Sequence, residues 1–303
     1  VVMKSTSRWS AVALFALWPT GLQGPQTVNV TVHEGTSMAV AVSPDGRTLA
    51  IDLQGGIWTL PATGGAARRV TDEYNDARQP VWSPDGKWIA FQGYRDGGYD
   101  IWAVAPDGTG LHQLTRGPYD DREPAWSHDG TKVAFSSDRV DAGNYNVWVL
   151  DIPSGAITQV TTDRADDYMP TWGPGDREIA FIATRNGEQG VYAASLTGAN
   201  EHKLAGGTGR ADAPSWGPGG AVVYHALGTG TSRLERDGKS LTGDENAFPF
   251  RASWVSATEF FYVSDGKIRK RATTGGDAGT IEFSATFTVT PARYTRRKRD
   301  FDA

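Results

Sequence analysis

A repeated turn-and-strand unit is the feature that most constrains how this chain can fold. Its clearest copy runs from Gln79 to Phe91 and reads Gln-Pro-Val-Trp-Ser-Pro-Asp-Gly-Lys-Trp-Ile-Ala-Phe. Successive copies are spaced by 40, 44, 46, 44 and 38 residues, at Val42, Trp82, Trp126, Trp172, Trp216 and Trp254. A period of about 40 residues with four short strands per unit is typical of a β-propeller blade. Six anchors therefore predict an all-β fold, a six-bladed propeller with four-stranded antiparallel blades.

One unit can be divided into strands from its turn residues. In the second unit, Pro84-Asp85-Gly86 has the composition of a tight turn, because proline presets φ and glycine accepts positive φ. The unit then predicts strands at Pro80–Ser83, Trp88–Gln92, Tyr99–Ala105 and Leu111–Thr115. Aromatic residues recur at one place in the third strands and are expected to fill the space between neighbouring sheets, at Trp58, Trp102, Trp148 and Tyr192.

The last unit is short of one strand. Segments 251–255, 259–264 and 267–272 supply three strands, so the fourth must come from elsewhere. The alternating segment 27–32 is predicted to supply it, which would close the ring by joining the N- and C-terminal strands and remove an exposed sheet edge. Segment 281–290 also alternates and could pair beside it. The sequence leaves open which of the two is outermost.

The two ends of the chain predict separate segments around the propeller, which is expected to span residues 25–292. A basic stretch followed by the apolar run Ala11–Trp18 predicts a signal peptide over residues 1–24, with a short N-terminal helix as the alternative. Export would place the protein in the periplasm or outside the cell. Residues 293–303 are rich in Arg and Lys and predict a basic tail or linker.

Charge and composition argue against several classes of partner. The net charge is −5, so no nucleic-acid partner is expected, and no segment is apolar over a length that would span a bilayer. The absence of cysteine removes disulfides and thiolate chemistry. We expect a monomer.

The units with Pro-x-Trp-Ser-Pro-Asp-Gly, an apolar strand and then Ile/Val-Trp resemble the TolB-like, or PD40, propeller repeat, most clearly in units two to four. More narrowly, segments 32–38, 283–290 and 296–301 resemble the N-terminal propeller of secreted amidohydrolases. That resemblance implies a metal-dependent hydrolase domain further along such chains. The alternative function is therefore the propeller module of a hydrolase whose catalytic domain is absent from this chain.

Histidine spacing gives no catalytic pattern. A metal hydrolase of that type needs a His-x-His pair with further ligands, and the sequence has neither that pair nor a Gly-x-Ser-x-Gly motif. The five histidines are scattered, at His33, His112, His128, His202 and His225. We therefore expect no catalytic residue in this chain.

Charged residues precede each predicted innermost strand, and such strands begin around the central channel of a propeller. The residues expected to converge at one channel mouth are Asp76, Arg78, Asp120, Asp121, Arg122, Asp166, Asp167, Asp212 and Glu245. Three interpretations remain open for them. They form a structural network of turns and ion pairs, or a docking site for a protein or peptide, or a hard-cation site. For the last, calcium is the candidate cofactor, with Asp121, Asp167 and Asp212 as ligands.

The leading functional prediction is a non-catalytic, exported propeller that binds a protein or peptide partner at the channel mouth. The hydrolase module described above is the first alternative. A calcium-dependent propeller hydrolase is the second, and it predicts an ion at the channel centre.

Overall fold

The computed structural model describes residues 27–72, 75–95, 97–206, 209–228 and 230–290. The predicted signal peptide (1–24) and basic tail (293–303) lie outside these residues. Contacts divide the chain into two units, one of which is Thr31–Thr286. The described residues of the other unit are 27–30 and 287–290, where Thr288 Oγ1 donates a hydrogen bond to Asn29 Oδ1 over 3.0 Å.

Six four-stranded antiparallel sheets make up most of the described part of unit Thr31–Thr286. The first three sheets contain β2 (Val40–Val42), β3 (Thr48–Leu53), β4 (Gly56–Pro61) and β6 (Arg68–Arg69); β7 (Arg78–Trp82), β8 (Ile89–Tyr94), β9 (Tyr99–Val104) and β10 (His112–Gln113); and β11 (Asp121–Trp126), β12 (Lys132–Asp141), β13 (Asn144–Asp151) and β14 (Ile157–Gln159). The other three contain β15 (Tyr168–Trp172), β16 (Glu178–Arg185), β17 (Glu188–Ser195) and β18 (His202–Ala205); β19 (Arg210–Trp216), β20 (Val222–Leu227), β21 (Ser232–Arg236) and β22 (Lys239–Ser240); and β23 (Ser253–Trp254), β24 (Glu259–Ser264), β25 (Lys267–Ala272) and β26 (Gly279–Ile281). The all-β prediction and the four-stranded units are confirmed.

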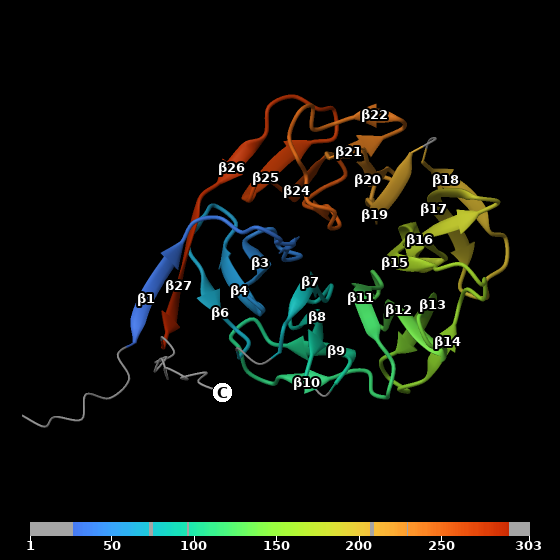
Figure 1. Ribbon diagram of the computed structural model, residues 1–303, viewed down its shortest axis with the longest axis horizontal. Coiled ribbons are helices and arrows are strands. Elements are labelled where there is room, and N and C mark those ends of the chain that lie inside the picture. The colour runs from blue at the N-terminus through green and yellow to red at the C-terminus, as the bar shows by residue number, and fades with distance from the viewer. Residues whose placement is uncertain (1–26, 73–74, 96, 207–208, 229, 291–303) are drawn as a thin grey trace, which may run out of the picture. The chain divides into compact units, whose positions relative to one another are not determined.

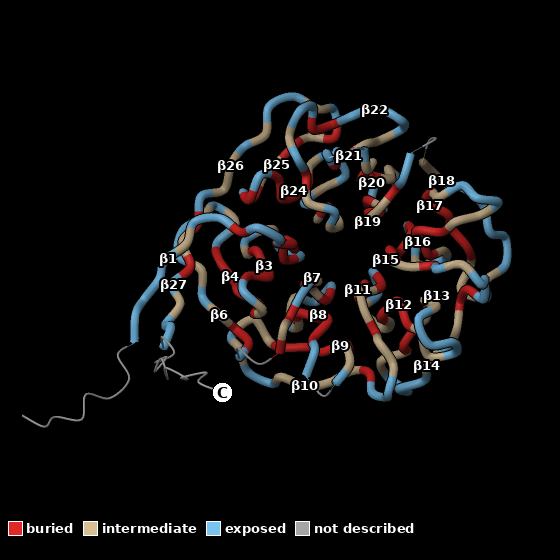
Figure 2. Tube along the Cα trace, viewed as in Figure 1, coloured by how far each residue is buried: buried red, intermediate tan, exposed pale blue. Residues whose placement is uncertain are grey.

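The sheets are arranged so that their first strands lie toward the centre and their last strands toward the periphery, as β7, β11, β15 and β19 show against β10, β14, β18 and β22 (Figure 1). Buried residues concentrate in the middle strands (Figure 2). Core clusters combine neighbouring sheets, for example Val149 of β13 with Phe181 of β16. Trp58, Trp102 and Tyr192 are buried as predicted, and Trp148 is partly buried against the core.

The Ser-Pro-Asp-Gly turns have the local hydrogen bonds that their composition predicts. Ser83 Oγ donates to Asp85 Oδ1 over 2.7 Å and accepts from Trp88 N over 3.0 Å, while Gly86 takes a φ of 69°. The turn that contains Ser127 and Asp129 repeats the first bond over 2.6 Å. Each turn therefore fixes the geometry between the innermost strand and the next one.

A bulge in the innermost strands accompanies the residue before each proline. Gln79, Glu123, Met169 and Ala213 each precede a proline and have φ between 43° and 58°. The pairing of the innermost strand with its neighbour shifts register at these four places. Positive φ is unusual for non-glycine residues, so other contacts must hold this backbone in place.

The strand predicted to complete the last sheet is a different one. β26 pairs with β25, so the last sheet is completed by the strand that directly follows it in sequence. A local hairpin closes at lower entropic cost than pairing with the opposite end of the chain, which explains the outcome. β1 (Val28–Val32) instead lies beside β27 (Phe283–Val289) in a three-stranded sheet with β5 (Gly65–Ala66). The prediction that segment 27–32 supplies the outer strand of the last sheet was wrong, and its pairing with segment 281–290 is confirmed.

The first and last four-stranded sheets are in direct contact. Val42 N donates a hydrogen bond to Ser253 Oγ over 2.8 Å. Among the described residues, the one helical element is the short 3-10 turn η1 (Pro174–Asp176). These residues contain no helix that is long and apolar enough to cross a bilayer.

Candidate functional site: a charged aromatic cluster and a central cavity

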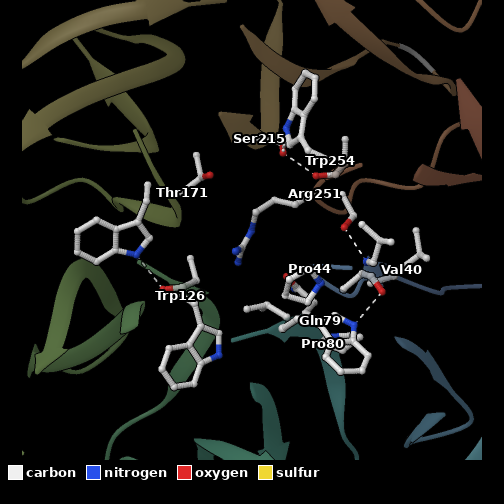
Figure 3. A pocket seen from close by; sticks show the side chains of 18 of the residues that line it. Val40, Pro44, Gln79, Pro80, Trp126, Thr171, Ser215, Arg251 and Trp254 are labelled. Atoms are coloured by element: carbon white, nitrogen blue, oxygen red, sulfur yellow. Dashed lines mark hydrogen bonds between the residues drawn. The ribbon is translucent and has the colours of Figure 1, made fainter. Parts of the chain in front are cut away.

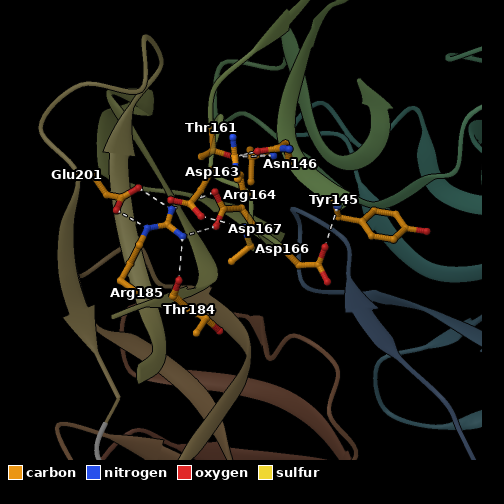
Figure 4. Close-up of polar contacts among 12 residues, drawn as sticks. Tyr145, Asn146, Thr161, Asp163, Arg164, Asp166, Asp167, Thr184, Arg185 and Glu201 are labelled. Carbon is orange, nitrogen blue, oxygen red and sulfur yellow. Dashed lines mark hydrogen bonds and ion pairs between the residues drawn. The ribbon is translucent and has the colours of Figure 1, made fainter. Parts of the chain in front are cut away.

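Two of the predicted mouth carboxylates are buried in ion pairs. Asp121 accepts two bonds from Arg139 Nη2, over 2.8 and 2.7 Å. Asp167 pairs in the same way with both terminal nitrogens of Arg185, over 2.8 and 3.0 Å (Figure 4). Both aspartates are fully buried, and Arg185 also bonds Glu201. These carboxylates are matched by arginine and do not face a shared opening.

The arginines also cover the aromatic residues of the third strands. Arg139 lies 5.2 Å from the ring centroid of Trp148, and Arg185 lies 5.6 Å from that of Tyr192. In the second sheet, Arg95 lies in the same way over the third-strand aromatic residue, 5.6 Å from the ring centroid of Trp102. Its buried hydrogen-bond partner there is Asn75. The recurrence of this arrangement in three sheets indicates a structural role.

The calcium candidates are not gathered at one place in the described residues. Within the ranges listed above, no group of three or more His, Cys, Asp or Glu side chains is placed to hold a metal ion. Asp121 and Asp167 direct their oxygens to arginine, and Asp212 accepts a hydrogen bond from Ala213 N over 2.9 Å. Calcium binding by these three residues stays a prediction.

A second set of predicted residues does come together and forms a charged aromatic cluster. The Arg122 guanidinium lies 4.5 Å from the ring centroid of Tyr99 and 5.5 Å from that of Tyr145, and Arg122 Nη2 donates to Asp120 over 2.6 Å. Tyr99 N also donates to Asp120, over 2.9 Å. Tyr99 OH donates to Asp76, which pairs with Arg78 over 3.1 Å. We call this set the mouth cluster: Asp76, Arg78, Tyr99, Asp120, Arg122 and Tyr145.

The protonation states in the mouth cluster follow from these contacts. Burial acts to raise the pKa of Asp120, but hydrogen bonds from Tyr99 N and Arg122 outweigh it and hold that pKa below its usual range. Burial raises the pKa of Tyr145 to about 12, so its hydroxyl stays protonated at neutral pH. The cluster therefore carries fixed charges of both signs beside two neutral phenols.

The remaining predicted residues lie in different surroundings. Asp166 accepts a hydrogen bond from Tyr145 N over 2.9 Å and so adjoins the mouth cluster (Figure 4). Glu245 lies between β22 and β23, where Tyr262 OH and Arg271 of the last sheet donate to it. Burial, with a smaller contribution from the Glu123 carboxylate, raises the pKa of Asp212 to about 6.

Sequence reasoning missed the two tyrosines of the mouth cluster. Tyr99 and Tyr145 each lie three residues before the third-strand tryptophan of their unit, so a comparison of repeats contained the signal. A tyrosine that recurs at one register position in adjacent units places two rings on adjacent sheets. The gap between them is where Arg122 lies.

The central cavity lies at the opposite ends of the innermost strands, where the repeat tryptophans are. It encloses about 360 Å³. Its lining includes Trp82, Trp126, Trp172, Trp216 and Trp254. None of the nine predicted mouth residues lines it.

One basic side chain extends into this cavity. Figure 3 shows the Arg251 side chain among the residues that line the cavity. Arg251 Nη1 donates to Pro124 O over 2.8 Å, and Nη2 donates to Glu123 O over 2.7 Å. Burial lowers the pKa of Arg251 to about 10, because the guanidinium is removed from water without an ion-pair partner. No Asp or Glu is among the residues that line the cavity. By its place in the repeat, Arg251 was expected among the arginines that interleave with the mouth carboxylates, but in the structure it lines this cavity.

Comparisons with known proteins agree with this architecture. A family model described as the TolB β-propeller domain matches residues 17–218. A TolB structure from Acinetobacter baumannii has a TM-score of 0.63 at 15% identity, covering 84% of this chain and 67% of that one. A TolB structure from Agrobacterium tumefaciens has a TM-score of 0.57 at 18% identity, covering 86% and 82%. A puromycin-hydrolysing peptidase from Mycobacterium tuberculosis has a TM-score of 0.59 at 16% identity, covering 82% and 45%.

Proposed function

Because this chain belongs to the TolB β-propeller family, as its TolB-like repeats predict, we propose that it is a non-catalytic module that binds a protein partner. Its six four-stranded sheets are proposed to act as six blades of a closed ring. The hydrogen bond from Val42 N to Ser253 Oγ supports closure, because it joins the first sheet to the last. The pairing of β1 with β27 adds a second link between sequence-distant strands.

The mouth cluster is the proposed binding surface, and the stack of Arg122 between Tyr99 and Tyr145 is the observation that carries the proposal. Tyrosine and arginine are among the residues that contribute most to protein interfaces. The side chains of Arg122 and Asp120 remain 36% and 29% exposed, so a partner can reach them. Their mutual contacts hold them in place before binding, which lowers the entropic cost of association.

An extended peptide segment is the proposed form of the partner. The mouth cluster presents positively and negatively charged side chains together with two aromatic rings. Such a surface suits a short peptide that carries polar and aromatic side chains. The proposed compartment is the periplasm, where proteins exported by the predicted signal peptide would fold.

Site-specific photo-crosslinking tests this function. Benzoylphenylalanine would replace Arg78, an exposed member of the mouth cluster, and in a matched control it would replace exposed Lys239 of the outer strand β22. We expect a discrete crosslinked protein in periplasmic extract from the first position only. Arg122→Ala should lower its yield roughly tenfold, as expected for an interface residue of this kind. Equal products from both positions, or no effect of Arg122→Ala in a protein that keeps its circular dichroism spectrum, would refute binding at the mouth cluster.

The second candidate is the propeller module of an amidohydrolase-type or related hydrolase. The M. tuberculosis peptidase favours it, since this chain covers only 45% of that protein. The test is the intact mass of the protein from its native source. A mass well above the 32.6 kDa of this chain, together with hydrolytic activity of the longer product, would favour the hydrolase module over an independent binding protein.

A further inference from the structure

We propose that the central cavity binds a carboxylate attached to an apolar or aromatic body, with Arg251 as its anion-binding residue. This site lies at the opposite ends of the innermost strands from the mouth cluster and does not depend on partner binding there. The proposal rests on the charge balance of the cavity, on its unused hydrogen-bond donors and on the composition of its walls.

The charge balance of the cavity is incomplete. Arg251 makes hydrogen bonds to two main-chain carbonyls and has no ion pair with a described carboxylate. Glu123 is the nearest candidate counter-ion, but its carboxylate accepts hydrogen bonds from Ser136 Oγ over 2.7 Å and Met169 N over 2.8 Å, and it does not line the cavity. Arg251 is only partly buried, but cations drawn out of water in proteins are normally paired with an anion. The cavity therefore holds one positive charge that has no direct ion pair and only the longer-range field of the Glu123 carboxylate, in a chain whose net charge is −5.

The cavity also has more donors than acceptors to match them. A guanidinium carries five N–H donors, and the two bonds to Pro124 and Glu123 leave others available while fixing the plane of the group. Trp126 and Trp216 line the same cavity, and their indole nitrogens are buried without an acceptor. A ligand that only accepts hydrogen bonds would satisfy the remaining guanidinium donors, whereas the two indole nitrogens have no accessible surface in the cavity.

The walls and the single charge narrow the ligand class. Tryptophan, proline and valine side chains make up much of the lining, and about 360 Å³ is within the usual range for a small-molecule site. The exposed residues Pro44, Pro84 and His128 are part of the lining, so the cavity reaches the surface beside the Ser-Pro-Asp-Gly turns. One arginine balances a monoanionic carboxylate, whereas a phosphate dianion would leave a charge unbalanced.

Binding of small acids tests the proposal directly. The probes are N-acetyl-leucine, which carries a terminal carboxylate, and N-acetyl-aspartate amide, which carries a side-chain carboxylate. N-acetyl-leucinamide is the uncharged control, and inorganic phosphate tests the charge argument. Tryptophan fluorescence and calorimetry would follow the titrations. We expect saturable binding of at least one carboxylate with a Kd on the order of 1 mM, and at least tenfold weaker binding of the amide and of phosphate.

Variants assign the binding to the cavity. Arg251→Met should abolish carboxylate binding, Arg251→Lys should weaken it, and Arg233→Met, an exposed arginine in β21, should leave it unchanged. If Arg251→Met does not fold, Arg251→Lys and Trp126→Phe carry the test, since each keeps most of the side-chain volume. Absence of saturable carboxylate binding, equal binding of the amide, or unchanged affinity in the Arg251 variants would overturn the proposal. None of these results bears on crosslinking at Arg78, so the two sites are judged separately.

Discussion

The carboxylate of Asp52 in β3 accepts the backbone N–H of Gln79 in β7 over 2.7 Å, and so connects two neighbouring sheets. Its other oxygen accepts Ala39 N, also over 2.7 Å. Gln79 has a φ of 52° and precedes Pro80, so its N–H is turned out of the strand ladder at the bulge. The next sheets repeat the contact with other polar side chains: Gln92 accepts Glu123 N, and Ser136 accepts Met169 N. A polar side chain on the second strand therefore holds the bulge of the following sheet.

Asp52→Ala should destabilise the protein because it leaves the buried N–H of Ala39 and the partly buried N–H of Gln79 without acceptors. Burial raises the pKa of Asp52 to about 6, so the side chain is ionised at pH 7.5 and both oxygens accept hydrogen bonds. We expect a loss of about 2–3 kcal/mol in the free energy of unfolding, measured by urea denaturation. The exposed Asp244→Ala is the control and should stay near the parent value. Equal midpoints for the two variants would show that Asp52 does not hold the bulge.

Asp212 should make stability fall as the pH rises through the weakly acidic range. Its pKa is raised to about 6 in the folded protein, against 3.8 as the ordinary value, so the folded state binds more protons between these values. The cost of ionising Asp212 is absent below about pH 4 and complete above about pH 6. Asp212→Asn should therefore gain about 2–3 kcal/mol of stability relative to the parent at pH 7 compared with pH 4. The measurement is urea unfolding of both proteins across this range, and a pH-independent difference between them would contradict the assignment.

Breaking the Asp167–Arg185 pair should cost much more than breaking an exposed pair. Asp167 is fully buried, so Arg185→Met leaves a buried carboxylate without a cation. We expect a loss of about 3–5 kcal/mol, part of which the double variant Asp167→Leu/Arg185→Met should recover. Lys203→Met, which removes an exposed pair with Glu188, should cost less than about 1 kcal/mol. A double variant less stable than Arg185→Met would argue that the pair has a favourable net contribution of its own.

The strand order was predictable from the sequence because each unit repeats one turn and one apolar pattern. The four strands of the second unit lie within a few residues of their expected positions. The fourth strand of the last sheet was not predictable from the sequence. This strand, β26, is only Gly279–Ile281 and is too short to show an alternating apolar pattern. Local hairpin closure decided that pairing, and no single residue marks it.

The site was harder to predict because the aspartates just before the innermost strands look alike in the sequence. The pairs Asp120-Asp121 and Asp166-Asp167 look equivalent within each pair in the sequence. In the structure the first member of each pair contacts the mouth cluster and the second is buried beneath an arginine. Asp120, Asp166 and Asp167 precede β11 and β15 and Asp121 is the first residue of β11, so the regular alternation of a strand does not fix the direction of these side chains. The direction of Arg251 depends on its side-chain conformation, which no spacing in the sequence encodes.

Two tryptophans at the same place in the repeat allow a matched test of how neighbouring sheets are joined. Trp172 Nε1 donates to Ala125 O of the preceding sheet over 2.9 Å, as Trp82 Nε1 does to Ala41 O over 3.1 Å. Trp126 Nε1 is buried without an acceptor. Replacement by phenylalanine removes the same atoms at both positions. Trp172→Phe leaves the carbonyl of Ala125 without its donor, whereas Trp126→Phe removes an indole N–H that had no acceptor.

We therefore expect Trp172→Phe to lower the free energy of unfolding by about 1 kcal/mol more than Trp126→Phe. Urea denaturation monitored by far-ultraviolet circular dichroism is the suitable measurement, because fluorescence would change with the loss of either indole. The slope of the transition should be the same in both variants if each still unfolds cooperatively. If Trp126→Phe were the more damaging change, the indole–carbonyl bond would not be what joins these sheets. The contribution of the tryptophans would then lie in ring packing alone, because packing is the contact that both positions share.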